Sequence, residues 1–324
     1  MLTLYRDEGG AVRSGPDRDL PEHVIWMDLV DPTDEERAFV EGRAGIRVPS
    51  REALSEIEAT SRLIVERGVL YLSMPLLARA SGTEFVLSPV GFVLGPRVLV
   101  TVRFAALPAF DTVAEQVRGD ETLASGVGVF TALLETVVDR GADVLERLGA
   151  ELDRVSRSVF RGDSTDPRHE VRKSASLRAL LSTVGNVGDR ASQARDILLG
   201  AGRIAAFVDD LGTKWISEEF HARLRAVSKD VASLNDYESH LSNKVQFLLD
   251  AILGFISIEQ NDLFKILTIA SVVGVPPTLL AGVWGMNFKA MPELDWTWGY
   301  PMALVVILLS AVVPLVWFKR RGWF

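Results

Sequence analysis

The chain has 324 residues, no cysteine, and a formal net charge of −8 at pH 7. The absence of cysteine excludes disulfides and thiolate metal sites, and the acidic balance argues against nucleic-acid binding, which needs a basic surface. The opening MLTLYRDEGGAVRSG has no apolar run of the kind that makes a secretory signal peptide.

Residues 1 to about 110 have the pattern of an α/β domain. Residues 24–30 (VIWMDLV) predict a strand, and a helix is expected directly after Pro32. Thr33 and Glu36 have the spacing of a capping box, in which each side chain bonds the other residue's backbone. Further strands are expected at 62–66 and 70–75, followed by a hairpin of 89–94 and 98–104 around a Gly-Pro turn.

Residues 107 to 211 are helical and charged, and they predict a helical hairpin broken at 161–167 (RGDSTDP). A second long helix is expected from about His169. The first helix carries an apolar stripe at helical spacing, formed by Leu133, Val137, Val144, Leu148 and Leu152. The mixed charges elsewhere on both helices are typical of a solvated surface.

A heptad pattern follows this hairpin. One series is Leu224, Val231, Glu238, Val245 and Ile252, and the other is Val227, Leu234, Leu241, Leu248 and Phe255. One continuous helix is expected from about 215 to 284, roughly 70 residues or 105 Å long. The stripe can pack against the chain's own helices or against other copies, and the length of the helix favours self-association.

Two apolar segments have the length of membrane spans. Residues 266–288 contain no charged residue over 23 positions, and residues 299–318 add 20 more. A buried helical hairpin of a soluble protein is the alternative, but such core segments seldom exceed about 14 uncharged residues. Lys319, Arg320 and Arg321 follow the second span, so the positive-inside rule places both ends of the chain in the cytoplasm.

The first span carries a weakly polar stripe without any acid or histidine. Phe264, Leu267, Ser271 and Thr278 fall within about 60° of each other on a helix, and Gly285 shares the stripe. Taken singly, each has an ordinary structural explanation: packing for the apolar residues, and bonding back to the helix for the hydroxyls. Pro276 and Pro277 can kink the span and release two carbonyl groups.

The end of this span suits a hydrated divalent cation. Mg²⁺ gives up its water reluctantly, and its water shell presents O–H donors outward. The amide oxygen of Asn287 is a suitable acceptor for those donors, although Asn287 could also be an ordinary helix cap. Glu293 and Asp295 in the following segment would raise the local cation concentration, or they are ordinary solvated loop charges.

These residues also carry a family resemblance. Gly285-Met286-Asn287 after a span, then MPEL at 291–294, a second span and a basic tail resemble the CorA magnesium transporters. IWMDLVDPTDEE and LSPVGFVLGPRVLVTVRF are similar to the cytoplasmic domain of that family. The resemblance implies a funnel-shaped homopentamer. Each subunit would have an α/β cytoplasmic domain with a helical hairpin, a very long stalk helix and two C-terminal transmembrane helices.

The resemblance also implies a division of the chain and roles for single residues. Its segments would be a cytoplasmic domain (1–214), a stalk (215–262), a pore-lining span (263–288), a periplasmic loop (289–298), an outer span (299–318) and a basic tail (319–324). The selectivity ring would be Gly285, Met286 and Asn287, and Thr278 and Asn261 would form polar rings. Phe264, Leu267 and Val275 would form the constriction. Lys265 with Lys319, Arg320 and Arg321 would form a basic collar, or they are topology anchors.

The sequence departs from the family pattern at several positions. Trp284 stands where the family often has Tyr before its triplet, and Phe264 and Val275 stand where Met is common. A stalk acid that senses Mg²⁺ in studied members corresponds without gaps to Ala226, and Asp230 could replace it if the register shifts by one turn.

Three functions are compatible with these features. The first is a Mg²⁺ channel of the CorA type, with Co²⁺ or Ni²⁺ as further candidates. The second is a ZntB-like, proton-coupled Zn²⁺ transporter, and the third is a membrane-anchored sensor or enzyme without a pore. The intact GMN and MPEL favour the first. No enzyme is expected, because there is no phosphate loop and no cluster among His23, His169, His221 and His240. No cofactor is expected, and Mg²⁺ would be the substrate and a candidate regulator.

Overall fold

A computed structural model describes residues 1–6, 10–14, 23–56, 62–79, 85–117, 119–160, 170–211, 214–287, 291 and 296–323. The chain forms two compact units. Unit 1 comprises Met1–Gly162 and Ser182–Leu248, and unit 2 comprises Asp163–Leu181 and Leu249–Phe324. The break expected at 161–167, and His169, lie outside the described residues.

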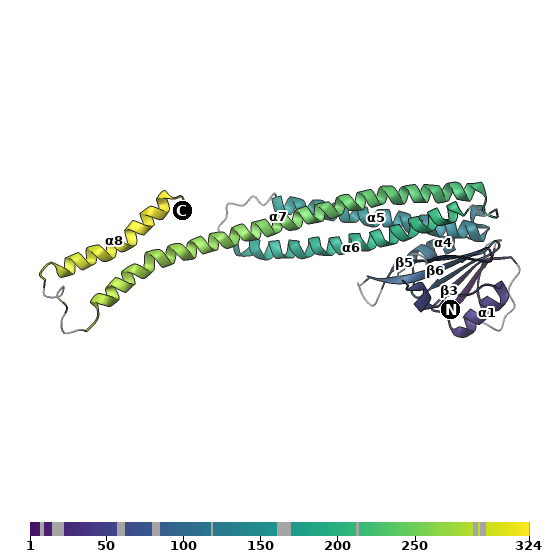
Figure 1. Ribbon diagram of the computed structural model, residues 1–324, viewed down its shortest axis with the longest axis horizontal. Coiled ribbons are helices and arrows are strands. Elements are labelled where there is room, and N and C mark those ends of the chain that lie inside the picture. Colours follow the sequence, from purple (N-terminus) through teal and green to yellow (C-terminus); the bar gives the residue numbers. More distant parts are fainter. Residues whose placement is uncertain are drawn as a thin grey trace. The chain divides into compact units, whose positions relative to one another are not determined.

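Unit 1 contains a mixed sheet whose seven described strands have the order β2-β1-β3-β7-β6-β5-β4. Strands β3, β5 and β6 are labelled in Figure 1. The strands are β1 (Leu2–Arg6), β2 (Gly10–Ser14), β3 (Val24–Val30), β4 (Leu63–Glu66), β5 (Val69–Arg79), β6 (Phe85–Leu94) and β7 (Leu99–Arg103). Only β3 and β7 pair in parallel. All the strands predicted in residues 24–104 are confirmed, whereas β1 and β2 were not predicted.

Strand β5 continues beyond Pro75, where the sequence predicted its end. Pro75 lies opposite Pro89 of β6. A proline removes a ladder hydrogen bond in the middle of a sheet. Here the neighbouring strands have already ended, since β4 pairs no further than Leu72 and β7 no further than Val90. The two prolines therefore cost the sheet little pairing.

Helices cover both faces of the sheet. The helices α1 (Asp34–Ala44) and α2 (Arg51–Leu54) pack on the face that presents Met27 and Leu29. Because side chains alternate along a strand, Trp26 lies on the opposite face. It packs there with Phe110 of α4 (Pro108–Gln116). The predicted capping box of α1 is present, with Glu36 N donating to Thr33 Oγ1 over 3.2 Å and Thr33 N to Glu36 Oε2 over 3.0 Å.

A buried polar network joins β3 to β7 on the Trp26 face. Asp28 and Arg103 are only 2% and 7% exposed. Arg103 Nη2 donates to Asp28 Oδ2 over 2.8 Å, and its Nε lies 3.1–3.2 Å from both carboxylate oxygens. Thr101 Oγ1 donates to Asp28 Oδ1 over 2.7 Å and accepts from Trp26 Nε1 over 2.9 Å. The buried charges therefore satisfy one another.

The chain has three long helices, α5 (Gly126–Phe160), α6 (Glu170–Asp210) and α7 (Glu218–Trp284), and the parts of them that belong to unit 1 form a bundle (Figure 1). Helix α5 starts against the sheet at Gly126, where an added Cβ would lie 2.7 Å from the backbone N of Leu99. Gly200 of α6 makes a similar close approach to Met74 of β5. These two glycines therefore allow the helical bundle to pack directly on the sheet.

The long helix α7 agrees with the prediction, beginning at Glu218 and ending at Trp284. Its heptad stripe, however, is buried within the single chain. Most members are at most 9% exposed: Leu224, Val227, Val231, Glu238, Leu241, Val245, Leu248 and Ile252. Val231 packs at Gly202 of α6, and Leu241 packs at Gly149 of α5. The preference for self-association along this stripe was therefore wrong, because the chain's own hairpin covers it.

Glu238, the polar interruption in the stripe, is 1% exposed. Its Oε1 accepts from Ser242 Oγ over 2.7 Å, and its Oε2 lies 3.4 Å from Arg195 Nη1 of α6. That second contact is an ion pair without hydrogen-bond geometry, since Oε2 has no hydrogen-bond partner among the described residues. The apolar stripe predicted on α5 is also buried, with one exception. Val144 is only half-buried, and the neighbouring Leu145 takes the fully buried position.

Candidate functional site

Unit 2 contains two helices that are long and apolar enough to cross a membrane. They are the C-terminal part of α7 and α8 (Gly299–Arg320), with mean hydropathies of 1.9 and 2.5 over their most apolar windows. Their apolar side chains face outward: Phe264, Leu267 and Val275 are 60–66% exposed in the single chain. Such continuous exposed apolar surface needs lipid or protein to cover it.

Aromatic side chains stand at both ends of α8. Trp296, Trp298 and Tyr300 are 53–76% exposed near its start, and Trp317 and Trp323 are 49% and 38% exposed near its end. Trp and Tyr concentrate at membrane–water interfaces because their rings are amphipathic. The 22 residues of α8 span about 33 Å at 1.5 Å per residue, which matches a bilayer core of about 30 Å.

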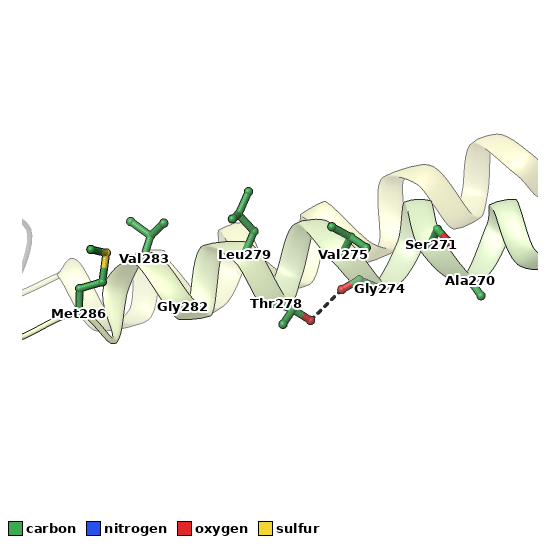
Figure 2. A pocket seen from close by; sticks show the side chains of 9 residues that line it. All are labelled: Ala270, Ser271, Gly274, Val275, Thr278, Leu279, Gly282, Val283 and Met286. Atoms are coloured by element: carbon green, nitrogen blue, oxygen red, sulfur yellow. Dashed lines mark hydrogen bonds between the residues drawn. The ribbon is translucent and has the colours of Figure 1, made fainter.

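A groove of about 860 Å³ runs along α7 (Figure 2). Its lining follows two rows of residues four apart: Ala270, Ser271, Gly274, Val275, Thr278, Leu279, Gly282, Val283 and Met286. The hollow arises where Gly274 and Gly282 carry no side chain. Of the predicted pore-lining residues, the groove includes Ser271, Val275 and Thr278. Asn261, Phe264 and Leu267 are exposed on preceding turns of the same helix.

The hydroxyl groups on this segment donate to their own helix. Thr278 Oγ1 donates to the carbonyl of Gly274 over 2.9 Å (Figure 2), and Ser271 Oγ donates to that of Leu267 over 2.8 Å. This is the ordinary behaviour of Ser and Thr in a helix. It also has a chemical consequence: with its single proton committed, each hydroxyl meets the groove only as an acceptor.

Two carbonyl groups in the middle of the span lose their helical donors. Pro276 and Pro277 lie inside α7, and proline has no N–H to donate to the carbonyl four residues earlier. The carbonyls of Val272 and Val273 therefore lack the usual helical bond. In an apolar environment such groups need another partner, such as water or a neighbouring helix.

Helix α7 ends immediately before the Gly285-Met286-Asn287 triplet. Gly285 N donates to Ala281 O over 2.9 Å, and a Cβ on Gly285 would lie only 3.1 Å from that oxygen. Asn287 is exposed and does not have the left-handed backbone of a capping asparagine. Its amide has no hydrogen bond with the residues that the structure describes, so it can bind another molecule.

The charged residues predicted near the two ends of the first span are Lys265, Glu293 and Asp295. Lys265 Nζ lies 2.7 Å from Asp262 Oδ1, one turn earlier on α7, so its charge is locally balanced. Glu293 and Asp295 lie outside the described residues. Over the described ranges, no group of three or more His, Asp or Glu side chains is arranged to hold a metal ion.

Asp230 is exposed on α7 and interacts with an acidic row on α5. The pKa of Asp139 is raised by burial, and further by the negative charges of Glu135, Asp143 and Asp230. The Asp139 carboxylate is therefore disfavoured at this surface, although Glu135 is itself paired with Arg223, whose Nε donates to Glu135 Oε1 over 2.8 Å. Ala226, one turn before Asp230, has no group that could bind a cation.

The small residues of the groove are functional candidates that appear only in the structure. Ala270, Gly274 and Gly282 were not among the candidate site residues, although all three line the hollow. Their spacing in multiples of four is a recognisable signal, because small residues at this interval let membrane helices approach closely.

Comparisons with known proteins agree with this organisation. "Magnesium transport protein CorA" of Salmonella typhimurium strain LT2 is 31% identical over 301 residues, which cover 93% of this chain and 92% of the relative. The protein of the same description from Escherichia coli K12 is 31% identical over 302 residues, with the same coverage of both chains.

Solved structures share the fold at low sequence identity. The complete CorA magnesium transporter of Methanocaldococcus jannaschii has a TM-score of 0.75 at 16% identity, covering 100% of this chain and 99% of that one. The ZntB cytoplasmic domain of Vibrio parahaemolyticus has a TM-score of 0.56 at 10% identity, covering 79% of this chain and 98% of that one. The sequence model of the family described as "CorA-like Mg2+ transporter protein" matches residues 21–320, and the chain belongs to this family.

Proposed function

We propose that this protein is a divalent-cation channel that takes up mainly Mg²⁺, with Co²⁺ or Ni²⁺ as further substrates. The observation that carries the proposal is the exposed amide of Asn287 directly after an uncharged membrane-length helix. Family membership and the 31% identity to magnesium transport proteins support it.

The channel is proposed to be a homopentamer in the plasma membrane with both chain ends in the cytoplasm. The proposed segments are a cytoplasmic domain (1–214), a stalk (215–262), a pore-lining span (263–288), a periplasmic loop (289–298), an outer span (299–318) and a basic tail (319–324). The exposed apolar faces of α7 and α8 support this arrangement, because one copy leaves them uncovered. Glu293 and Asp295 would gather cations at the periplasmic loop.

The ion would enter the pore with its water shell. Mg²⁺ exchanges ligands reluctantly, so the amide oxygens of Asn287 from several copies would accept hydrogen bonds from bound water. Gly285 and Met286 complete this selectivity ring. Farther along, the hydroxyls of Thr278 and Ser271 offer only lone pairs, since their protons bond the helix backbone. As hydrogen-bond acceptors, these two hydroxyl groups are suited to the O–H donors of a hydrated cation.

Phe264, Leu267 and Val275 would form the hydrophobic constriction. All three are exposed in the single chain and would face the pore axis in the oligomer. An apolar ring opposes passage of a hydrated ion unless it widens, which gives the pore a gate. Asn261 would form the polar ring at the cytoplasmic end. Lys265, balanced by Asp262, would contribute to a basic collar at the pore mouth. Lys319, Arg320 and Arg321 are assigned the alternative role, anchoring of the tail at the membrane surface.

Asp230 is proposed to take part in Mg²⁺ sensing by attracting hydrated cations together with the acidic row on α5, since the described side chains of one copy are not arranged to ligate a metal ion directly. The pKa of Asp139 is raised first by partial burial and then by the neighbouring negative charges, and a nearby divalent cation would offset the second contribution. Because the folded pKa is raised, the Asp139 carboxylate destabilises the fold above that pKa. This cost disappears as the pH falls and the group becomes protonated.

Replacing Asp139 with Asn is therefore expected to raise the free energy of unfolding at pH 7, by less than about 1 kcal/mol given solvent screening. The gain should vanish below about pH 3, where the wild-type carboxyl is protonated in both the folded and the unfolded state. Thermal unfolding across pH, with and without Mg²⁺, measures both effects. Asp236→Asn, an exposed acid on α7, is the control. An equal gain in both variants, or a gain that persists at low pH, would contradict the role of local repulsion.

Ion flux distinguishes the proposed function from the alternatives. Proteoliposomes loaded with a Mg²⁺ dye should show Mg²⁺ entry that needs no pH gradient. Zn²⁺ entry driven by a proton gradient, without Mg²⁺ entry, would instead indicate a ZntB-like transporter. Entry of neither ion would indicate a membrane-anchored sensor without a pore. Fold similarity to a ZntB domain does not separate these outcomes, because it covers only part of the chain at 10% identity.

A further inference from the structure

The end of α8 forms a closed cap with a specific geometry. Gly322 has a left-handed backbone with φ of 73°. Trp323 N donates to Phe318 O over 3.1 Å, and Gly322 N donates to Lys319 O over 3.2 Å. These two bonds define a Schellman motif, which satisfies the last carbonyls of a helix. The cap therefore turns the chain sharply where the apolar span ends.

Aromatic rings close this cap. The Trp323 ring folds back onto Phe318, with 5.0 Å between the two ring centroids. The ring centroid of Trp317, the preceding residue, lies 5.1 Å from that of Phe318. Phe318 is only 3% exposed, on a helix most of whose other large apolar residues are exposed. Trp317 and Trp323 keep about 40–50% of their surfaces exposed. The cap thus presents two amphipathic rings, which suit the headgroup depth of a bilayer.

Three cations project from the same turn. Lys319, Arg320 and Arg321 are exposed, and none of them forms an ion pair with an acid in the described part of the chain. Successive residues on a helix are 100° apart, so the three side chains fan out over about 200° of the helix end. The Arg321 guanidinium lies 4.9 Å from the Trp317 ring centroid, and that packing leaves its N–H edge available.

We propose that this cap, residues 317–323, binds the phosphate groups of anionic lipid headgroups in the cytoplasmic leaflet. The phosphate supplies the counter-charge that the described residues do not, and guanidinium groups match phosphate oxygens in bidentate geometry. Trp317 and Trp323 hold the cations at headgroup depth. This lipid site rests on one part of the proposed function, namely that α8 crosses a bilayer. The site does not require the protein to conduct ions.

Lipid selectivity of the full-length protein tests this site. The protein is reconstituted in phosphatidylcholine vesicles that contain a small fraction of spin-labelled phosphatidylglycerol or spin-labelled phosphatidylcholine. Electron paramagnetic resonance then gives the relative association of each lipid with the protein. Wild type is expected to prefer phosphatidylglycerol by about fivefold, the factor that corresponds to about 1 kcal/mol for one lipid charge at a basic site. The Lys319→Gln/Arg320→Gln/Arg321→Gln variant should fall to near parity between the two lipids.

Two further variants keep the test decisive. Arg67→Gln/Arg97→Gln/Lys229→Gln removes three exposed cations outside the span and should keep the wild-type preference. Gly322→Val retains every charge but is strained at φ of 73°, and it should lose about half of the preference. A preference that persists in the triple-Gln variant, or that falls equally in the control, overturns the proposal. Wild-type selectivity in Gly322→Val overturns the part assigned to the cap.

The outcome is separable from the proposed transport function. If Mg²⁺ entry fails while the lipid preference and its loss are observed, the channel proposal fails and the lipid site stands. If flux is normal while wild type does not distinguish the two lipids, the lipid site fails alone.

Discussion

Replacing Asn287 with alanine is expected to reduce Mg²⁺ uptake into proteoliposomes at least about tenfold. Hydrogen bonds that involve a charged group contribute about 1.5–3 kcal/mol each, and the variant removes one acceptor per copy from the place where the hydrated ion is captured. The helix should be unaffected, because α7 ends at Trp284 and the Asn287 amide bonds no described residue. A Mg²⁺-sensitive dye measures uptake, and size-exclusion chromatography in detergent reports the oligomer.

Asn243→Ala is the matched control, since it makes the same chemical change at an exposed position of α7 outside the span. It should transport like the wild type. Normal uptake by the Asn287 variant would contradict capture through the water shell. Loss of the oligomer in that variant would show instead that Asn287 holds subunits together.

Replacing Arg103 with alanine is expected to lower the free energy of unfolding by about 3–5 kcal/mol, because Asp28 is left as an uncompensated buried charge. Asp28 is 2% exposed and depends on Arg103 and Thr101 for its hydrogen bonds. Urea unfolding of the full chain in detergent, followed by circular dichroism and tryptophan fluorescence, measures the loss.

Two comparisons sharpen this result. Arg47→Ala breaks an exposed pair with Glu66, in which the charged groups are 3.5 Å apart, and should cost less than about 1 kcal/mol. The double variant Asp28→Leu/Arg103→Met removes both buried charges and should recover much of the loss. If Arg103→Ala costs no more than Arg47→Ala, the network does not stabilise the sheet as its burial indicates.

Local sequence signals predicted the elements whose cause is local. The Thr33–Glu36 capping box depends on residues three apart, and the structure confirms both of its bonds. The two spans depend on continuous uncharged runs, and α7 ends at the expected Trp284. The first strands were missed although β1 carries a Leu-Thr-Leu-Tyr alternation and is no shorter than β4 and β7, which were predicted.

The heptad stripe shows where a local signal was insufficient. Its spacing correctly identified the buried side of α7, but spacing does not identify what covers that side. Gly149 and Gly202 place α5 and α6 close enough to cover Leu241 and Val231. Whether the stripe packs against its own chain or against another copy depends on how the helical hairpin folds back. A local sequence pattern does not contain that information.

The sequence by itself determined that this chain has a strand-rich first part, a very long helix and two apolar spans with an exposed asparagine between them. These properties follow from periodicity, runs without charge and turn residues. Tertiary structure alone decided that Asp28 meets Arg103 across 75 positions and that Asp230 acts on Asp139. The physical reason is that a partner contributes only when folding brings it within a few ångströms, and that distance is set by the packing of the whole chain.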